Sequence, residues 1–106
     1  MDYSQLSDEA IDDKVFFAKW VSDGGDVEYA KEILAMLHSH GNAPRYCNNP
    51  SDIIPLMIEH KISLVWVGGY WQAQPPFKNH VGSVNDDLNP LRAASIVFIK
   101  MMEAKA

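Results

Sequence analysis

The strongest constraint on the fold is a helical segment near the C-terminus that is apolar on most of its surface. Asn89 and Pro90 supply a helix cap and a first helical residue, so the sequence predicts a helix from there to about Glu103. Its polar side chains, Arg92, Ser95, Lys100 and Glu103, fall within an arc of roughly 140° when they are plotted at about 100° per residue. Such a helix is either the centre of the fold or buries a second face against another subunit.

The clearest β-pattern is the segment Ile62–Gln74, in which two strand-like runs flank Gly68-Gly69. This glycine pair suits a two-residue hairpin turn. The resulting register pairs Trp66 with Trp71 in a non-hydrogen-bonded position, where side chains across the two strands come closest. We expect both tryptophans to lie in the core. The alternative is an aromatic wall for a flat ligand. One face of the hairpin then carries Ile62, Leu64, Trp66, Trp71 and Ala73.

The remaining segments favour helices joined by polar loops. Capping residues and apolar periodicity predict helices from about Ser7 to Ser22, from Asp26 to Gly41 and from Asn49 to His60. The polar segment Phe77–Leu88 is interpreted as a long loop, with a short extended piece at His80-Val81. We therefore predict an α+β fold, with about four helices and a central β-hairpin packed on the C-terminal helix. At 106 residues, the chain has the usual size of a single domain, residues 1–106.

Charge and composition exclude several classes of protein. Fourteen acidic residues against nine basic ones give a net charge of −5, and the basic residues are spread along the chain, so we expect no non-specific binding of nucleic acids. Cys47 is the only cysteine, which is typical of a reducing compartment. The N-terminus lacks the pattern of a secretory signal, and no apolar run approaches the ~20 residues of a membrane span. These features predict a cytoplasmic protein without a membrane contact.

Catalytic and metal-binding signatures are weak. His38 and His40 form an HxH pair, but residues two apart on a helix point to different faces, so the pair does not converge on a metal. Cys47 between Tyr46 and Asn48 is interpreted as a small packed residue rather than a nucleophile. We therefore expect no catalytic residues, no bound metal and no cofactor.

Arg92 is the most informative charged residue, because it lies in the first turn of a helix, where the helix dipole favours anions. Either Asp86 or Asp87 offsets its charge, which we favour, or Arg92 binds an anionic ligand. In the second case Arg92 and the start of the last helix form a pocket beside Trp71, with Tyr46 and Arg45 at the rim. The candidate ligand-binding residues are Arg45, Tyr46, Asn49, Trp71, Asn89 and Arg92.

Several segments together resemble one family. They are Met1-Asp2-Tyr3-Ser4-Gln5-Leu6-Ser7-Asp8, Tyr46-Cys47-Asn48-Asn49-Pro50, Trp71 with Ala73, and Asn89-Pro90-Leu91-Arg92-Ala93-Ala94. In these segments the chain resembles the NinX-type accessory proteins of tailed phages and prophages, a family of unknown function. The resemblance implies a phage protein that acts in the cytoplasm of an infected bacterium. It implies no particular reaction and no catalytic residues.

The sequence favours a non-enzymatic binding protein that acts on a host component. It would bind a host protein or sequester a small anionic or nucleotide-like molecule, for example in counter-defence. The alternative is a small enzyme acting on a phosphorylated or nucleotide substrate at Asn89, Arg92 and Trp71. The wide apolar surface of the last helix and its adaptable Met101-Met102 end also predict a homo-oligomer, most simply a dimer.

Overall fold

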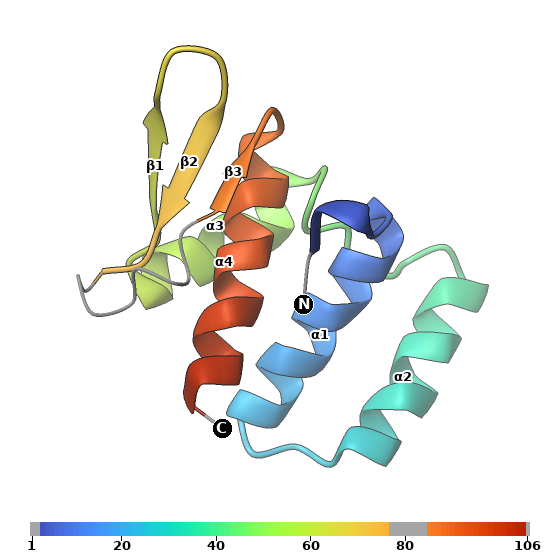
Figure 1. The fold of residues 1–106 in the computed structure, drawn as a ribbon. Coiled ribbons are helices and arrows are strands. Elements are labelled where there is room, and N and C mark those ends of the chain that lie inside the picture. The colour runs from blue at the N-terminus through green and yellow to red at the C-terminus, as the bar shows by residue number, and fades with distance from the viewer. Residues whose placement is uncertain (1–2, 77–84, 106) are drawn as a thin grey trace.

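The computed structural model describes residues 3–76 and 85–105 and has an α+β fold, as predicted (Figure 1). Three antiparallel strands form a sheet in the order β1-β2-β3, and the sheet packs against the C-terminal helix. The elements in chain order are a 3-10 turn at Tyr3–Gln5, α1 at Asp8–Ser22, α2 at Val27–Ser39, α3 at Pro50–His60, β1 at Ser63–Trp66, β2 at Trp71–Gln74, β3 at Asn85–Asp87 and α4 at Pro90–Lys105.

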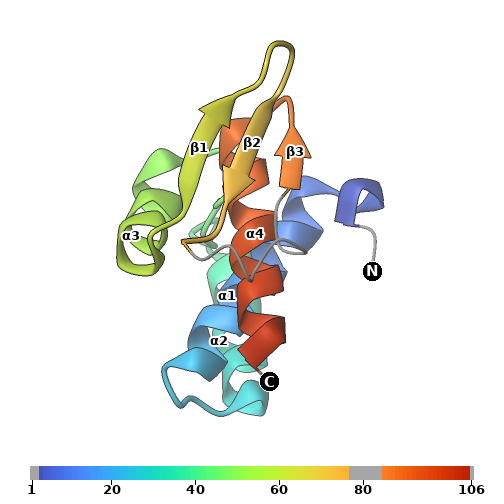
Figure 2. The same ribbon diagram turned by 60° about the vertical axis from the view of Figure 1, so that its left-hand side comes forward.

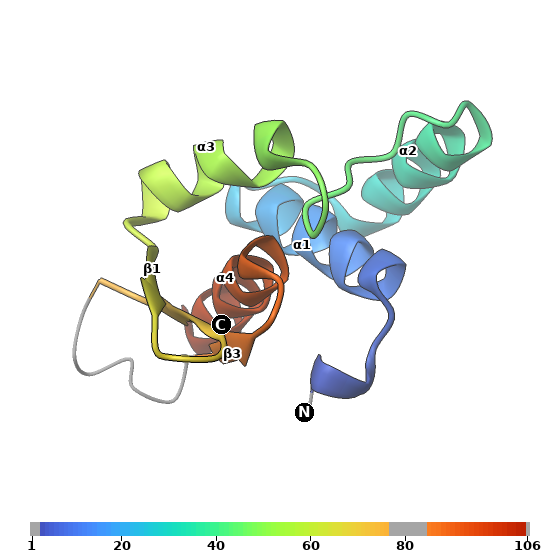
Figure 3. The same cartoon turned by 90° about the horizontal axis from the view of Figure 1, so that it is seen from above.

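Helix α4 is the centre of the fold. Residues 93–99 are all buried, and α1, α3 and the sheet surround the helix when it is seen from above (Figure 3). The apolar surface that the sequence predicted is therefore covered within one chain. Met101, at the end suggested for subunit contact, is only 5% exposed. The expected homodimer therefore needs another surface.

The helices begin at the polar residues that the sequence indicated. The side chains of Ser7, Asp26 and Asn49 each accept a hydrogen bond from a backbone N–H of the first turn of α1, α2 and α3. Such caps each stabilise a helix by about 1 kcal/mol. Gly41 follows the end of α2 with φ of 70°, a conformation that favours glycine. These local signals fix where α1, α2 and α3 begin and where α2 ends.

The hairpin has the predicted register, with Trp66 opposite Trp71, and both turn glycines have positive φ. The prediction that Trp66 lies in the core is wrong, because 55% of its surface is exposed. Trp71 is partly buried, and the two rings meet edge-to-face with centroids 5.4 Å apart. The physical reason is the length of the hairpin. Its tip extends past the start of α4, so only the base of the hairpin packs against the core (Figure 2).

The segment predicted as a loop before the last helix contains a strand, so that part of the prediction is wrong. Strand β3, Asn85–Asp87, pairs antiparallel with β2 and places Asp87 opposite Trp71. Aspartate and asparagine rarely occur in strands, which explains why the pattern gave no β-signal. The extended piece predicted at His80-Val81 lies outside the described residues. None of the helices in the described part of the chain has the length and apolar character that a membrane span requires.

Candidate functional site

Arg92 is the centre of a largely buried polar network. Its Nη1 lies 2.6 Å from Asp8 Oδ1, and its Nε lies 3.1 Å from Asp87 Oδ2. Its Nη2 donates to the backbone carbonyl oxygens of Tyr3 and Leu6, at 3.1 and 2.7 Å. The predicted internal ion pair is thus confirmed for Asp87, and Asp8 is an additional partner that the sequence did not suggest.

Asn89 joins the start of α4 to the loop before α3. Its side-chain oxygen accepts a hydrogen bond from the Leu91 N–H at 2.9 Å, which caps the helix. Its amide nitrogen donates to the Cys47 carbonyl oxygen at 2.7 Å. The neighbouring Asn48 donates to Asp8 Oδ2 at 3.0 Å. Asn89 and Arg92 are therefore tied to this loop through Cys47 and Asp8.

The structure brings only part of the predicted ligand-binding set together. Tyr46 is 5% exposed and belongs to the core, so it does not form a rim. Asn49 caps α3 through Ser51, and Trp71 packs on Trp66 in the hairpin. Arg45 is exposed and lines a pocket, which lies on the α1 side of the loop.

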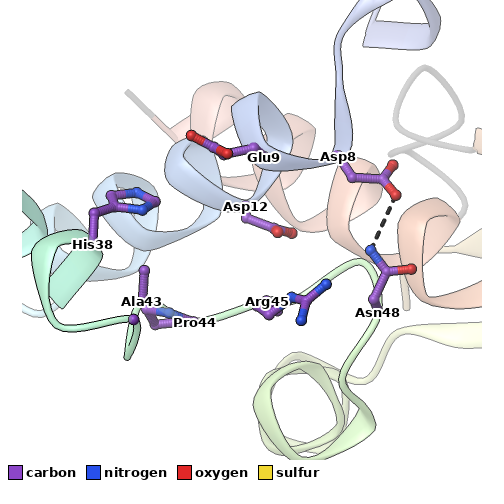
Figure 4. Close-up of a pocket in the computed structure, with 9 residues that line it drawn as sticks. Asp8, Glu9, Asp12, His38, Ala43, Pro44, Arg45 and Asn48 are labelled. Atoms are coloured by element: carbon purple, nitrogen blue, oxygen red, sulfur yellow. Dashed lines mark hydrogen bonds between the residues drawn. The ribbon is translucent and has the colours of Figure 1, made fainter.

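That pocket, which we call the acidic pocket, has a volume of about 280 Å³ and lies between the first half of α1, the end of α2 and the loop before α3 (Figure 4). Helix α1 places Asp8, Glu9 and Asp12 on one side, and the loop places Arg45 and Asn48 on the other. Asp12 lies three residues after Glu9 and four after Asp8, and these spacings place side chains on the same face of a helix. The residues that line it are Asp8, Glu9, Asp12, His38, Gly41, Ala43, Pro44, Arg45 and Asn48.

Two carboxyl groups of the acidic pocket have pKa values that are shifted in opposite directions. The hydrogen bond from Asn48, together with the Arg92 guanidinium, lowers the pKa of Asp8, so that Asp8 is held as a carboxylate. Burial raises the pKa of Asp12, although its Oδ1 accepts the Cys47 N–H at 2.8 Å. The pocket thus combines one firmly ionised acid with one whose charge is destabilised by burial.

His38 lies at the edge of the pocket and contacts α1. Its Nε2 is 2.9 Å from Asp13 Oδ1, and this hydrogen bond raises the pKa of His38. Glu9, Asp13 and His38 each offer a ligand atom within 4.8 Å of the others, a set of oxygen and nitrogen ligands that zinc accepts. The sequence prediction considered the HxH pair and missed this group, whose one visible signal is the i,i+4 spacing of Glu9 and Asp13.

Cys47 is fully buried, and burial raises the pKa of its thiol, with the neighbouring Asp12 adding to the effect. A thiol that resists ionisation is a poor nucleophile. The prediction that Cys47 is a packed residue is therefore confirmed.

Comparisons with protein-family models, curated proteins and solved structures found no match to this chain. The resemblance to NinX-type proteins consequently stays a prediction.

Proposed function

We propose that this protein is a non-enzymatic binding protein that acts on a host protein in the cytoplasm of an infected bacterium, and that a basic side chain of the host protein enters the acidic pocket. The phage context rests on the resemblance described above. The observation that carries the proposal is the concave surface on which α1 gathers Asp8, Glu9 and Asp12. Carboxylates in a concave site bind lysine and arginine through charge-assisted hydrogen bonds.

Size and charge favour a protein side chain over a nucleotide. The volume of about 280 Å³ is below the range of roughly 300–1,000 Å³ for pockets that enclose drug-sized ligands. The carboxylates of α1 would also repel the phosphate groups of a nucleotide. Arg92, for which the sequence left anion binding as the alternative, donates instead to Asp8, Asp87 and backbone carbonyl oxygens.

The same contacts weaken the case for an enzyme. Arg92 and Asn89 hold α4, the N-terminal segment and the loop before α3 in place, and Cys47 is buried. Catalysis on a phosphorylated substrate would need donors aimed at the transferred group. The side-chain donors of Asn89 and Arg92 are directed at the protein itself.

The net charge supports the choice of a basic partner. A chain with a charge of −5 attracts basic surfaces over a distance of about 10 Å at moderate salt, and this attraction accelerates association. Binding should therefore weaken as the salt concentration rises.

The test begins with a defined probe. In an NMR titration, N-acetyl-arginine amide should shift the backbone amides of Glu9, Asp12 and Asn48, whereas N-acetyl-glutamate amide should not. Glu9→Lys should abolish the shifts. Glu28→Lys makes the same change in charge at the far end of α2, where the side chain is 79% exposed, and should leave the shifts intact.

The second step uses infected cells. Protein purified from them, wild type and both variants, is analysed by native mass spectrometry. A basic host protein that is retained by the wild type and Glu28→Lys but lost from Glu9→Lys is the expected result. Equal retention by all three, or shifts with the glutamate probe alone, would refute the proposed pocket.

A further inference from the structure

A second exposed surface lies on the other side of α4 from the acidic pocket, on the β-hairpin (Figure 1). We call Val65, Trp66, Val67 and Tyr70 the hairpin surface, and these residues are 40%, 55%, 38% and 40% exposed. The segment Ile62–Gln74 contains no charged residue. Exposed aromatic residues in an uncharged surface are typical of protein contact sites.

Strand β1 is an edge of the sheet, because the order is β1-β2-β3. The Val67 N–H donates to the Tyr70 carbonyl oxygen at 3.1 Å, so these two residues form a hydrogen-bonded pair. Hydrogen-bonded and non-hydrogen-bonded pairs alternate along two antiparallel strands. Val65 therefore directs its backbone groups toward β2, while Leu64 and Trp66 direct theirs outward. Among the residues that the structure describes, β1 pairs only with β2. Proteins usually protect such an edge with charges, proline or a bulge, and β1 has no charge or proline.

An apolar groove lies beside the start of β1. It is lined by α3, by the residues that join α3 to β1 and by the first residue of β1, and it contains Ile54 and Ile58, which are 42% and 68% exposed. The other residues that line it are Met57, Lys61, Ile62 and Ser63. One chain thus carries both a projecting apolar tip and an apolar groove.

We propose that a second copy of this chain pairs with the edge of β1, antiparallel and around a two-fold axis at Val65. In this register Leu64 forms a hydrogen-bonded pair with Trp66 of the second copy, and the reverse pair is equivalent by symmetry. Val67 of the second copy then lies opposite Ser63, and its glycine turn lies opposite Ile62. Each apolar tip therefore reaches the groove of the other chain. Because of the two-fold symmetry, this contact between tip and groove occurs twice in the dimer.

Charge and area favour a second copy as the occupant. Two chains with a net charge of −5 each repel one another. Contact through the uncharged segment Ile62–Gln74 keeps this electrostatic repulsion lowest. The large apolar residues of the hairpin surface and the groove expose about 500 Å² per copy, so a pair that covered all of it would bury about 1,000 Å², the lower limit of a specific interface. The two-fold arrangement is the commonest symmetry of soluble homo-oligomers.

The first test is the mass in solution, measured by sedimentation equilibrium over a range of concentrations. The wild type should approach twice 11.9 kDa at high concentration. Val65→Lys places two ammonium groups directly opposite each other across the axis, so this variant should stay monomeric. Gln72→Lys adds the same charge to the same face of the hairpin, opposite Val65 on the inner strand, and should still dimerise.

The second test is the register, measured by oxidation in a non-reducing gel. Val65→Cys should form a covalent dimer, because residues paired at the axis have the Cα separation that a disulfide needs. Ser63→Cys should not, since its two copies lie about 13 Å apart at the rise of a strand. Cys47 is buried and serves as an internal control. A wild type that is monomeric at every concentration would overturn the dimer. A Val65→Lys variant that dimerises, or cross-linking of Ser63→Cys instead of Val65→Cys, would overturn the pairing.

Discussion

Replacing Arg92 with alanine tests the central polar network. The side chain is 11% exposed and contacts Asp8, Asp87 and the carbonyl oxygens of Tyr3 and Leu6. Removal of one partner of a buried ion pair costs about 3–5 kcal/mol. In the variant, water can solvate the carboxylate of Asp8, which is 44% exposed. Asp87 is only 19% exposed, so most of the cost of burying its unpaired charge remains. We therefore expect the lower end, about 3 kcal/mol, which corresponds to roughly 10–15 °C in Tm for a domain of this size.

The assay is thermal and chemical unfolding followed by circular dichroism. Arg92→Lys should lose about half as much stability. An ammonium group keeps the charge but lacks the planar guanidinium, whose N–H groups donate to several acceptors at once. Lys31→Ala is the control: its ion pair with Glu28 is exposed, so its removal should cost less than about 0.5 kcal/mol. An Arg92→Ala protein that melts within a few degrees of the wild type would refute this reasoning. If that stable variant also lost a ligand, the anion-binding role that the sequence left as the alternative would replace the structural one.

Three further predictions concern single side chains. Gly25→Ala should cost about 1–3 kcal/mol in an unfolding assay, because a Cβ there would lie 2.1 Å from Trp20 Nε1. Asp12→Asn should raise Tm at pH 7 but not near pH 4. Burial raises the pKa of Asp12, so the stability that its protonated form contributes is lost as pH rises above the unfolded pKa of about 3.9. Asparagine stays neutral and does not lose it. A histidine NMR titration should place the pKa of His38 above 6.5, and Asp13→Asn should lower it. A wild-type Tm for Gly25→Ala, a gain for Asp12→Asn that is independent of pH, or an unchanged His38 titration would contradict them.

The parts of the fold that local chemistry determines could be predicted from the sequence. The caps of α1, α2 and α3 follow from a polar side chain before an apolar run, and the hairpin register follows from Gly68-Gly69. The wide apolar surface of α4 indicates that the helix is buried, whereas the structure shows that the same chain covers it. In each case a few neighbouring residues contain the whole signal.

The missing parts depend on contacts between distant segments. Arg92 lies 84 positions from Asp8, so nothing near Arg92 in the sequence indicates this partner. The acidic pocket forms only when the loop before α3 returns to α1. The exposure of Trp66 depends on where α4 starts relative to the hairpin tip, and tryptophan occurs both in cores and in contact surfaces.

The two proposed surfaces have consequences for each other. The acidic pocket lies on the α1–α2 side of α4, and the hairpin lies on the opposite side, so a dimer through β1 leaves both pockets accessible (Figure 1). Two pockets held on one rigid core would bind a host assembly that repeats the same basic side chain with an avidity up to about 10²–10⁴ times that of one site, provided that the spacing fits. A monomeric Val65→Lys variant would then keep its affinity for N-acetyl-arginine amide but lose most of its affinity for such an assembly. Equal affinity of the monomer and the dimer for the host partner would instead show that each pocket acts alone.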